Sequence, residues 1–322
     1  MNASMKSLAL AATLALGAAS LAQATDYPTK SIDVIVPYGA GQATDVMCRA
    51  FLEQLRQELG QTIVPVNRPG AGGNIGGAEA ARAEPDGYTL LCTGNATHLG
   101  NPLMYDNMGF DPFEDLAPIN MIAGTGFVLL ANEKYEGKTV QEIVEEAKAS
   151  GEAPTLGVVS TTAQVVYGEL VDATGVEFVR VPYSAGNQAM FADLISGEID
   201  LAIEAMPSSV GQVQGGRIKA LAVTTPEESP FFPGVPTFHD LGYGIELVGW
   251  NAFYAPAGTP EEVLVKLNTA ANQALKAPDV SKTLAGVASL PLGGSPDDLR
   301  QKIAADGEKW ERTIRNLGLK AN

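Results

Sequence analysis

Residues 32–45 read IDVIVPYGAGQATD and place a turn with two glycines directly after a short apolar run. Beyond this turn, Met47, Phe51, Leu55 and Leu59 recur every four residues, which is the spacing of one face of a helix. The segment is therefore predicted to form a strand, a turn and a helix in that order. This order is typical of α/β proteins, in which helices cover a largely parallel sheet.

The alternation of strand and helix continues along the chain and starts again near Gly126. Strands are expected at 32–36, 62–66, 88–92, 127–131, 155–159, 177–181, 201–203 and 220–223. Helices are expected at 74–83, at 140–149 and through 189–195, and N-cap signatures at 259–262 and 295–298 begin two more. The two runs of this pattern predict two similar lobes, each a mainly parallel sheet flanked by helices.

The composition is that of a globular protein with an acidic surface. The chain has 322 residues, of which 45% are hydrophobic, so its length suits two domains with full cores. Its 21 Lys and Arg against 37 Asp and Glu give a net charge of −16. Such a charge repels phosphate backbones and anionic bilayers, so we expect no nucleic-acid partner and no membrane-surface binding.

The first 24 residues have the features of an export signal. Lys6 precedes an apolar run at 8–21, and Ala22-Gln23-Ala24 supplies the small residues of a cleavage site. The run is shorter than the roughly 20 apolar residues that cross a bilayer. The sequence therefore predicts a periplasmic protein whose signal peptide, residues 1–24, is cleaved after Ala24.

Cys48 and Cys92 are the two cysteines of the chain. In an oxidising compartment they could pair, but the sequence does not fix the distance between their Cα atoms. Because Cys48 falls in a predicted helix and Cys92 at the end of a predicted strand, two small buried thiols are the favoured interpretation. A disulfide stays open as the alternative, and the spacing offers no zinc site.

Few residues could carry catalysis. The chain has two histidines, His98 and His239, and no G-x-S-x-G sequence. His98 follows the third predicted strand, where it could donate a hydrogen bond to a ligand, whereas His239 lies in a Pro-rich stretch. We therefore expect a protein that is not an enzyme.

The glycines of residues 69–77, PGAGGNIGG, do not form a nucleotide-binding motif. Ile75 stands where G-x-G-x-x-G requires its third glycine, and the Lys-Ser/Thr ending of a P-loop is missing. The segment is interpreted as a turn whose glycines permit positive φ angles and close packing. No cofactor is expected.

The turn at 38–44 is a more informative feature. A loop that leaves the carboxyl end of a strand and enters a helix directs several backbone N–H groups to one point, at the positive end of the helix. The sequence therefore indicates a candidate anion site there, although Thr44 could equally be an ordinary N-cap.

Several segments together make the chain similar to a known family. They are YPTKSI at 27–32, VPYGAGQATD at 36–45, NRPGAGGNIG at 67–76, PDGYTL at 85–90, VPY at 181–183, ALAVT at 220–224 and APAGTP at 255–260. In this order the chain resembles the Bug (TctC-like) family, the solute-binding proteins of tripartite tricarboxylate transporters.

The resemblance implies a two-lobed periplasmic binding protein of the Venus-flytrap type, type II-like. Lobe 1 would comprise 25–124 and 251–322, and lobe 2 would comprise 125–250. Such a protein closes on a small organic carboxylate, which is a di- or tricarboxylate or an aromatic or amino-bearing acid, and delivers it to the membrane permease. A monomer is expected. The same pocket also allows a second hypothesis, a soluble receptor for a sensor kinase. An exported hydrolase is the third hypothesis.

The resemblance also implies which residues contact the ligand. From lobe 1 these are Tyr38, Gly39, Ala40, Gly41, Gln42, Thr44, Gly94, Asn95 and Thr97. From lobe 2 they are Ser160, Thr161, Thr162, Gln164, Tyr183, Ala185, Gly186, Asn187 and Glu204. Asp45 is expected to brace the first loop through its amides, because a carboxylate facing the ligand would repel it.

Three departures from the family pattern bear on the ligand. Gln42 replaces a usual second glycine, so its side chain narrows the pocket or adds a donor. The segment 160–167 lacks the usual Gly-rich, His-containing sequence, and Glu204 stands where Asp is frequent. If Glu204 faces the cleft in its ionised form, it disfavours a second carboxylate. No Lys or Arg lies in the matched loops, so the ligand is expected to be held by main-chain dipoles that act at contact distance.

Overall fold

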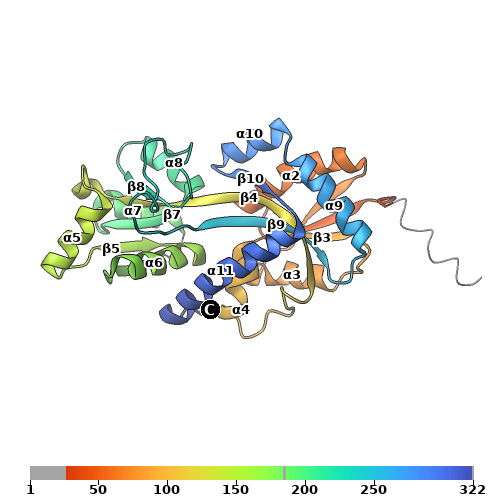
Figure 1. Ribbon diagram of the computed structural model, residues 1–322, viewed down its shortest axis with the longest axis horizontal. Coiled ribbons are helices and arrows are strands. Elements are labelled where there is room, and N and C mark those ends of the chain that lie inside the picture. The colour runs from red at the N-terminus through yellow and green to blue at the C-terminus, as the bar shows by residue number, and fades with distance from the viewer. Residues whose placement is uncertain (1–26, 184–185, 321–322) are drawn as a thin grey trace, which may run out of the picture.

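The computed structural model describes residues 27–183 and 186–320, so the predicted signal peptide lies outside the described residues. Its centre is a ten-stranded sheet in the order β2-β1-β3-β9-β4-β7-β5-β6, with β8 and β10 also paired to β4 (Figure 1). The strands are β1 (Ile32–Val36), β2 (Ile63–Asn67), β3 (Thr89–Gly94), β4 (Leu116–Ala131), β5 (Thr155–Val158), β6 (Val179–Pro182), β7 (Leu201–Ala205), β8 (Lys219–Val223), β9 (Val248–Pro256) and β10 (Leu290–Gly293).

Strand β4 joins the two lobes. Its first part pairs antiparallel with β9 from Leu116 to Gly126, and its last five residues pair with β7 and β8. The strand is 16 residues long, whereas the sequence predicted a strand only at 127–131. Prediction failed here because β4 contains Pro118, Gly124 and Gly126 and changes its register twice against β9, so no regular alternation marks it.

The parallel part of each lobe matches the pattern predicted from the sequence. In lobe 1, β1 pairs in parallel with β2 and β3, and in lobe 2, β5 pairs in parallel with β6 and β7. The remaining pairs, all through β4 and β9, are antiparallel. The carboxyl ends of the parallel strands therefore share one edge in each lobe, and the predicted ligand loops follow these ends.

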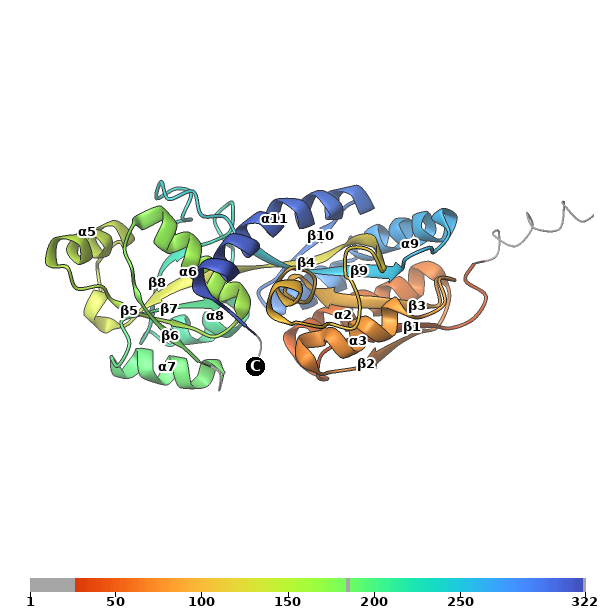
Figure 2. The ribbon, with the colours of Figure 1, turned by 90° about the horizontal axis from the view of Figure 1, so that it is seen from below.

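Helices cover both faces of the sheet, as Figures 1 and 2 show. One face of lobe 1 packs against α2 (Ala43–Leu59), α9 (Glu261–Ala274) and α10 (Pro278–Gly286), and the other against α3 (Asn74–Ala81) and α4 (Asn101–Met104). In lobe 2, α7 (Asn187–Ser196) and α8 (Met206–Gln214) cover one face, and α5 (Val140–Ser150) and α6 (Thr161–Thr174) the other. Short helical turns lie at η1 (Ala71–Gly73), η2 (Ala96–Gly100) and η3 (Glu133–Tyr135).

The last helix, α11 (Pro296–Leu317), contacts both lobes and lies along their junction in Figure 2. Its Trp310 side chain is buried in the core. Its Arg312 pairs with Glu169 and, at 3.1 Å, with Asp172, both of α6. The boundary that assigned all of 251–322 to lobe 1 remains a prediction, and these contacts give α11 a share in lobe 2 as well.

The two predicted N-caps have different outcomes. Ser295 accepts a hydrogen bond from the Asp298 amide at 3.1 Å, and Asp298 reaches back to the Ser295 amide, so this capping box is confirmed. The box at Thr259 is wrong. The Thr259 hydroxyl donates to the Pro256 carbonyl at 2.8 Å instead, and Pro260 takes the N-cap position of α9.

Candidate functional site

The first predicted loop connects β1 to α2 and leaves the start of this helix without a side-chain cap. Gln42 occupies the N-cap position but makes no capping hydrogen bond. The first amides of a helix have no acceptor within the helix, so those of Ala43, Thr44 and Asp45 form the positive end of α2. Gln42 instead accepts a hydrogen bond from the Gly39 amide at 3.1 Å, so its side chain lies against its own loop.

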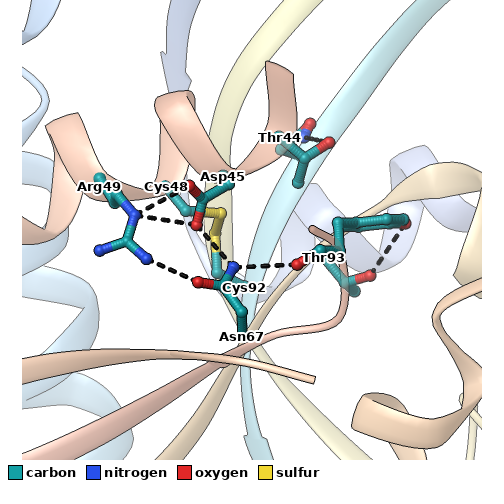
Figure 3. Close-up of a disulfide and its surroundings, with 9 residues drawn as sticks. Thr44, Asp45, Cys48, Arg49, Asn67, Cys92 and Thr93 are labelled. Carbon is teal, nitrogen blue, oxygen red and sulfur yellow. Dashed lines mark hydrogen bonds and ion pairs between the residues drawn. A yellow bond between two sulfur atoms is a disulfide. The ribbon is translucent and has the colours of Figure 1, made fainter. Parts of the chain in front are cut away.

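Asp45 holds this loop in place (Figure 3). Its buried carboxylate accepts hydrogen bonds from the Gly41 amide at 2.8 Å, from Asn67 at 2.8 Å and from Arg49 Nε at 2.9 Å. Burial acts to raise the pKa of Asp45, but the hydrogen bonds from Arg49, Gly41 and Asn67 outweigh it and keep the pKa below its usual value. The carboxylate is therefore satisfied within its own lobe.

Arg49 and Asn67 are members of this network that sequence reasoning missed. Arg49 Nη2 donates to Asn67 Oδ1 at 2.7 Å, and Asn67 Nδ2 also donates to the Tyr38 carbonyl at 2.9 Å. The spacing of Asp45 and Arg49, four residues apart on one helix, was the available signal. Asn67 offered none, because it comes from the end of a different strand.

The second predicted loop of lobe 1 follows β3 and is tied to the first. The Tyr38 hydroxyl lies 2.7 Å from Thr97 Oγ1, and Thr97 in turn donates to the Gly72 carbonyl. Asn95 is buried, and its Nδ2 has no hydrogen-bond partner among the described residues. A Cβ atom on Gly94 would lie 3.6 Å from the Tyr38 hydroxyl, so the structure brings these predicted residues together.

Asn251 of β9 is a further neighbour that was not predicted. It lies opposite Gly94 in the sheet, and its Nδ2 is 3.4 Å from Thr44 Oγ1. A strand at 248–256 was not expected from the sequence, so its side chains could not be placed at the site.

The glycines of 69–77 pack behind the first loop. A Cβ atom on Gly76 would lie 2.8 Å from Pro37 Cβ, and one on Gly73 would lie 2.7 Å from Thr97 Oγ1. Gly73 also has a φ of +99°, which other residues rarely adopt. The interpretation of this segment as a close-packed turn is confirmed.

In lobe 2, the loop after β5 begins α6 and reaches toward lobe 1. The Ser160 hydroxyl caps α6 by accepting the Ala163 amide at 3.1 Å, and Thr162 is buried. Thr161 lies beside lobe 1, because a Cβ atom on Gly100 of η2 would lie 3.5 Å from its Cγ2. The loops that follow β3 and β5 therefore meet.

A cation lies closer to the predicted site than the sequence suggested. Arg180 of β6 donates from Nη1 to Gln164 Oε1 at 2.8 Å, and its guanidinium lies 6.0 Å from the Tyr167 ring. Arg180 is outside the matched loops, so counting charges in those loops overlooked it. The Gln164 side-chain oxygen is thereby engaged within lobe 2.

The loop after β6 is oriented by Tyr183. Its hydroxyl donates to Asp193 Oδ2 at 2.6 Å, which directs it to α7. Burial raises the pKa of Tyr183 to about 12, and Asp193 adds to this effect. Gly186, with a φ of +100°, precedes Asn187 at the start of α7, and Ala185 lies outside the described residues.

Glu204 is buried near the end of β7, opposite Val128 of β4. Its Oε2 has no hydrogen-bond partner among the described residues. Burial raises its pKa to about 7, although hydrogen bonds from Ala205 and Ser208 act in the opposite direction. A carboxyl with this pKa is partly protonated at neutral pH, so a fully ionised Glu204 is not the state that this environment favours.

One expectation from the sequence is corrected at this site, and one stays a prediction. The His98 ring stacks on Tyr254 at 5.0 Å and makes an edge contact with Phe113, and burial lowers its pKa to about 4. The neutral ring keeps one N–H, and Nδ1 has no hydrogen-bond partner among the described residues, so donation to a ligand stays a prediction. Cys48 and Cys92 form a disulfide, with Cα atoms 6.3 Å apart, so the favoured interpretation as two thiols is wrong. The helix and strand that carry them lie side by side in the lobe 1 core.

Among the described residues, no three His, Cys, Asp or Glu side chains are grouped as a metal site would require. No helix in this part of the chain has the length and apolar character needed to cross a bilayer. The residues predicted for the site offer loop amides, hydroxyls and amide side chains from both lobes.

Comparison with known proteins identifies the family. Residues 47–319 match the model of the TctC family, described as the tripartite tricarboxylate transporter family receptor. Protein BugT from Bordetella pertussis is 34% identical over 309 residues, which is 94% of either chain. A solved R. palustris protein with adipate is 31% identical with a TM-score of 0.75, covering 92% of this chain and 99% of its own.

MatC from Rhodopseudomonas palustris, solved with bound malate, is 26% identical with a TM-score of 0.70, and the match covers 89% of this chain and all of MatC. The likeness thus extends through both lobes and the strands between them. This chain belongs to the Bug/TctC family of periplasmic receptors, whose members are two-lobed solute-binding proteins and not enzymes.

Proposed function

We propose that this protein captures a small organic carboxylate between its lobes and delivers it to the permease of a tripartite tricarboxylate transporter. The observation that carries the proposal is the start of α2. Its first turn has no side-chain cap, and the loop that precedes it is held by Asp45. Such an end is a ready anion site, because its free amides and the helix dipole both favour negative charge.

The buried network makes this site suited to an anion despite the acidic chain. Both oxygens of Asp45 accept hydrogen bonds from residues of lobe 1, so its charge is neutralised locally by Arg49. The remaining negative charges of the chain are screened beyond about 8 Å at physiological salt, whereas amides act at contact distance. A ligand carboxylate at the start of α2 thus experiences mainly the loop dipoles.

Lobe 2 would complete the site from the opposite side. Thr161 lies at the approach to lobe 1, with its methyl group beside Gly100, and Arg180 with Gln164 offers a polar group to a distal part of the ligand. The adipate and malate in the two solved relatives support a dicarboxylate as the first class to test, followed by tricarboxylates and aromatic or amino-bearing acids. Exclusion of water on closure strengthens each of these dipolar contacts.

The proposal includes the location of the protein. The Cys48–Cys92 disulfide supports an oxidising compartment, as expected for a chain exported with cleavage after Ala24. We propose that the mature protein acts as a monomer in the periplasm.

Isothermal titration calorimetry on protein freed of bound ligand by unfolding and refolding tests the function. We expect one ligand per chain from the panel adipate, malate, citrate, benzoate and aspartate, together with a smaller radius of gyration in X-ray scattering. Absence of binding to every member, with the refolded protein shown to be native by circular dichroism, would contradict the proposal.

A further inference from the structure

The disulfide joins the two elements of lobe 1 that carry the proposed ligand loops. Cys48 lies one helical turn after Thr44 in α2, and Cys92 lies two residues before Gly94 in β3. Both cysteines are fully buried. Figure 3 shows the disulfide below Asp45, and Thr93 follows Cys92 in β3.

The bond closes a ring around the start of α2. From Cys48 the ring runs through the helix to Thr44, across to Asn251, and through the β9–β3 pairing to Gly94 and back to Cys92. The contact between Thr44 and Asn251, at 3.4 Å, is long for a hydrogen bond. Of the cross-links between elements in this ring, the disulfide is the covalent one and so the one that resists displacement.

Helix α2 and strand β3 each hold a different part of the proposed site. Helix α2 must hold its first-turn amides toward the ligand, and the end of β3 must hold Gly94 and Asn95 beside them. The Asp45 network fixes the loop to β2 through Asn67, but β2 is on the far side of β1 from β3. The network reaches the loop after β3 through Tyr38, whose carbonyl accepts from Asn67 and whose hydroxyl lies 2.7 Å from Thr97 Oγ1. This link is a chain of hydrogen bonds, whereas the disulfide joins α2 to β3 covalently.

We propose that the Cys48–Cys92 disulfide is a positioning element of the ligand site, which fixes the start of α2 against the loop after β3. The inference rests on the proposed function, since the loops it positions are those of the ligand site. Preorganised loops bind more tightly because less ordering is needed on binding. The alternative is that the disulfide contributes only to the stability of the lobe.

The test compares Cys48→Ala/Cys92→Ala with Leu267→Ala. Leu267 is fully buried in α9 within the same core, so its truncation lowers stability without touching either loop. Affinity for adipate and malate is measured by calorimetry at a temperature where all forms are folded. We expect about tenfold weaker binding in the double variant, the equivalent of about one hydrogen bond, and unchanged affinity in the control.

Hydrogen exchange of the ligand-free protein gives a second measurement that needs no ligand. The two variants are compared under conditions in which their free energies of unfolding are equal. The backbone amides of 39–45 and 93–97 should then exchange faster in the double variant than in the Leu267→Ala control. Equal exchange and equal affinity in the two variants would overturn the positioning role. If no carboxylate binds the unchanged protein, the proposed function fails, while the exchange rates still decide the role of the disulfide.

Discussion

Glu204 shows at the scale of one residue how burial sets the charge state near the proposed site. Its pKa is raised from 4.5 to about 7 by burial, so the folded protein holds the proton more tightly than the unfolded chain. The sign follows from this difference. The folded state is favoured below pH 4.5, and stability is lost as the pH rises from 4.5 to 7 and the buried group ionises.

We therefore predict that Glu204→Gln is more stable than the unchanged protein at pH 8 and nearly equal at pH 4.5. The pKa difference corresponds to a gain of about 3 kcal/mol at most. Urea unfolding at both pH values measures it. Glu227→Gln is the control, because Glu227 is exposed on a loop. The burial explanation fails if the gain at pH 8 is no larger for Glu204→Gln than for this control.

The sequence identified the acidic residues near the ligand loops, but it did not predict their hydrogen-bond partners or their protonation. Asp45 and Glu204 were both recognised as carboxyls near the ligand loops, yet one is satisfied by three donors and the other has an oxygen without a partner. The difference depends on Asn67 and Arg49, and on the packing around β7. The spacing of Asp45 and Arg49 on one helix was a usable signal, but Asn67 and the packing around β7 involve distant segments, which residue spacing alone could not predict.

At the scale of elements, sequence patterns correctly predicted the elements whose contacts lie close together in the chain. The predicted strands at 32–36 and 88–92 appear as β1 and β3, and the Ser295 capping box was correct because all its contacts lie within four residues. Strand β4 was mostly missed because its extent depends on pairing with β9, more than 100 residues away. The disulfide was only the less favoured alternative for the same reason, since it depends on α2 packing beside β3.

Helix α2 offers a matched pair of glycines for testing its role. Gly41 at its start and Gly60 at its end both have positive φ angles, +81° and +64°, and an added Cβ would meet no atom within 4 Å at either position. Replacement by Val should therefore strain both positions similarly, by about 1–2 kcal/mol. Only the side chain at position 41 would occupy the proposed anion site.

We predict that both variants lower the melting temperature by a similar amount. Gly41→Val should also abolish carboxylate binding in calorimetry, whereas Gly60→Val should bind normally. If Gly41→Val keeps the affinity of Gly60→Val, the start of α2 does not contact the ligand. The comparison removes the effect of backbone strain, because both variants carry it.

At the scale of the whole molecule, long-range charge and local dipoles act in opposite directions. The net charge of −16 repels an approaching dianion, while the amides at the start of α2 attract it only near contact. Salt screens the first effect much more than the second. The usual pattern for a charged ligand, in which salt slows association, should therefore be reversed.

We predict that the association rate of adipate or malate rises several-fold between low and physiological ionic strength, while the dissociation rate stays nearly constant. Stopped-flow fluorescence of Trp250, which is buried in β9 near the site and donates to Asp306 at 2.8 Å, would follow the reaction. A rate that falls with salt would mean that the ligand is steered by a positively charged side chain such as Arg180. In that case side-chain charge, and not the backbone at the start of α2, would govern capture.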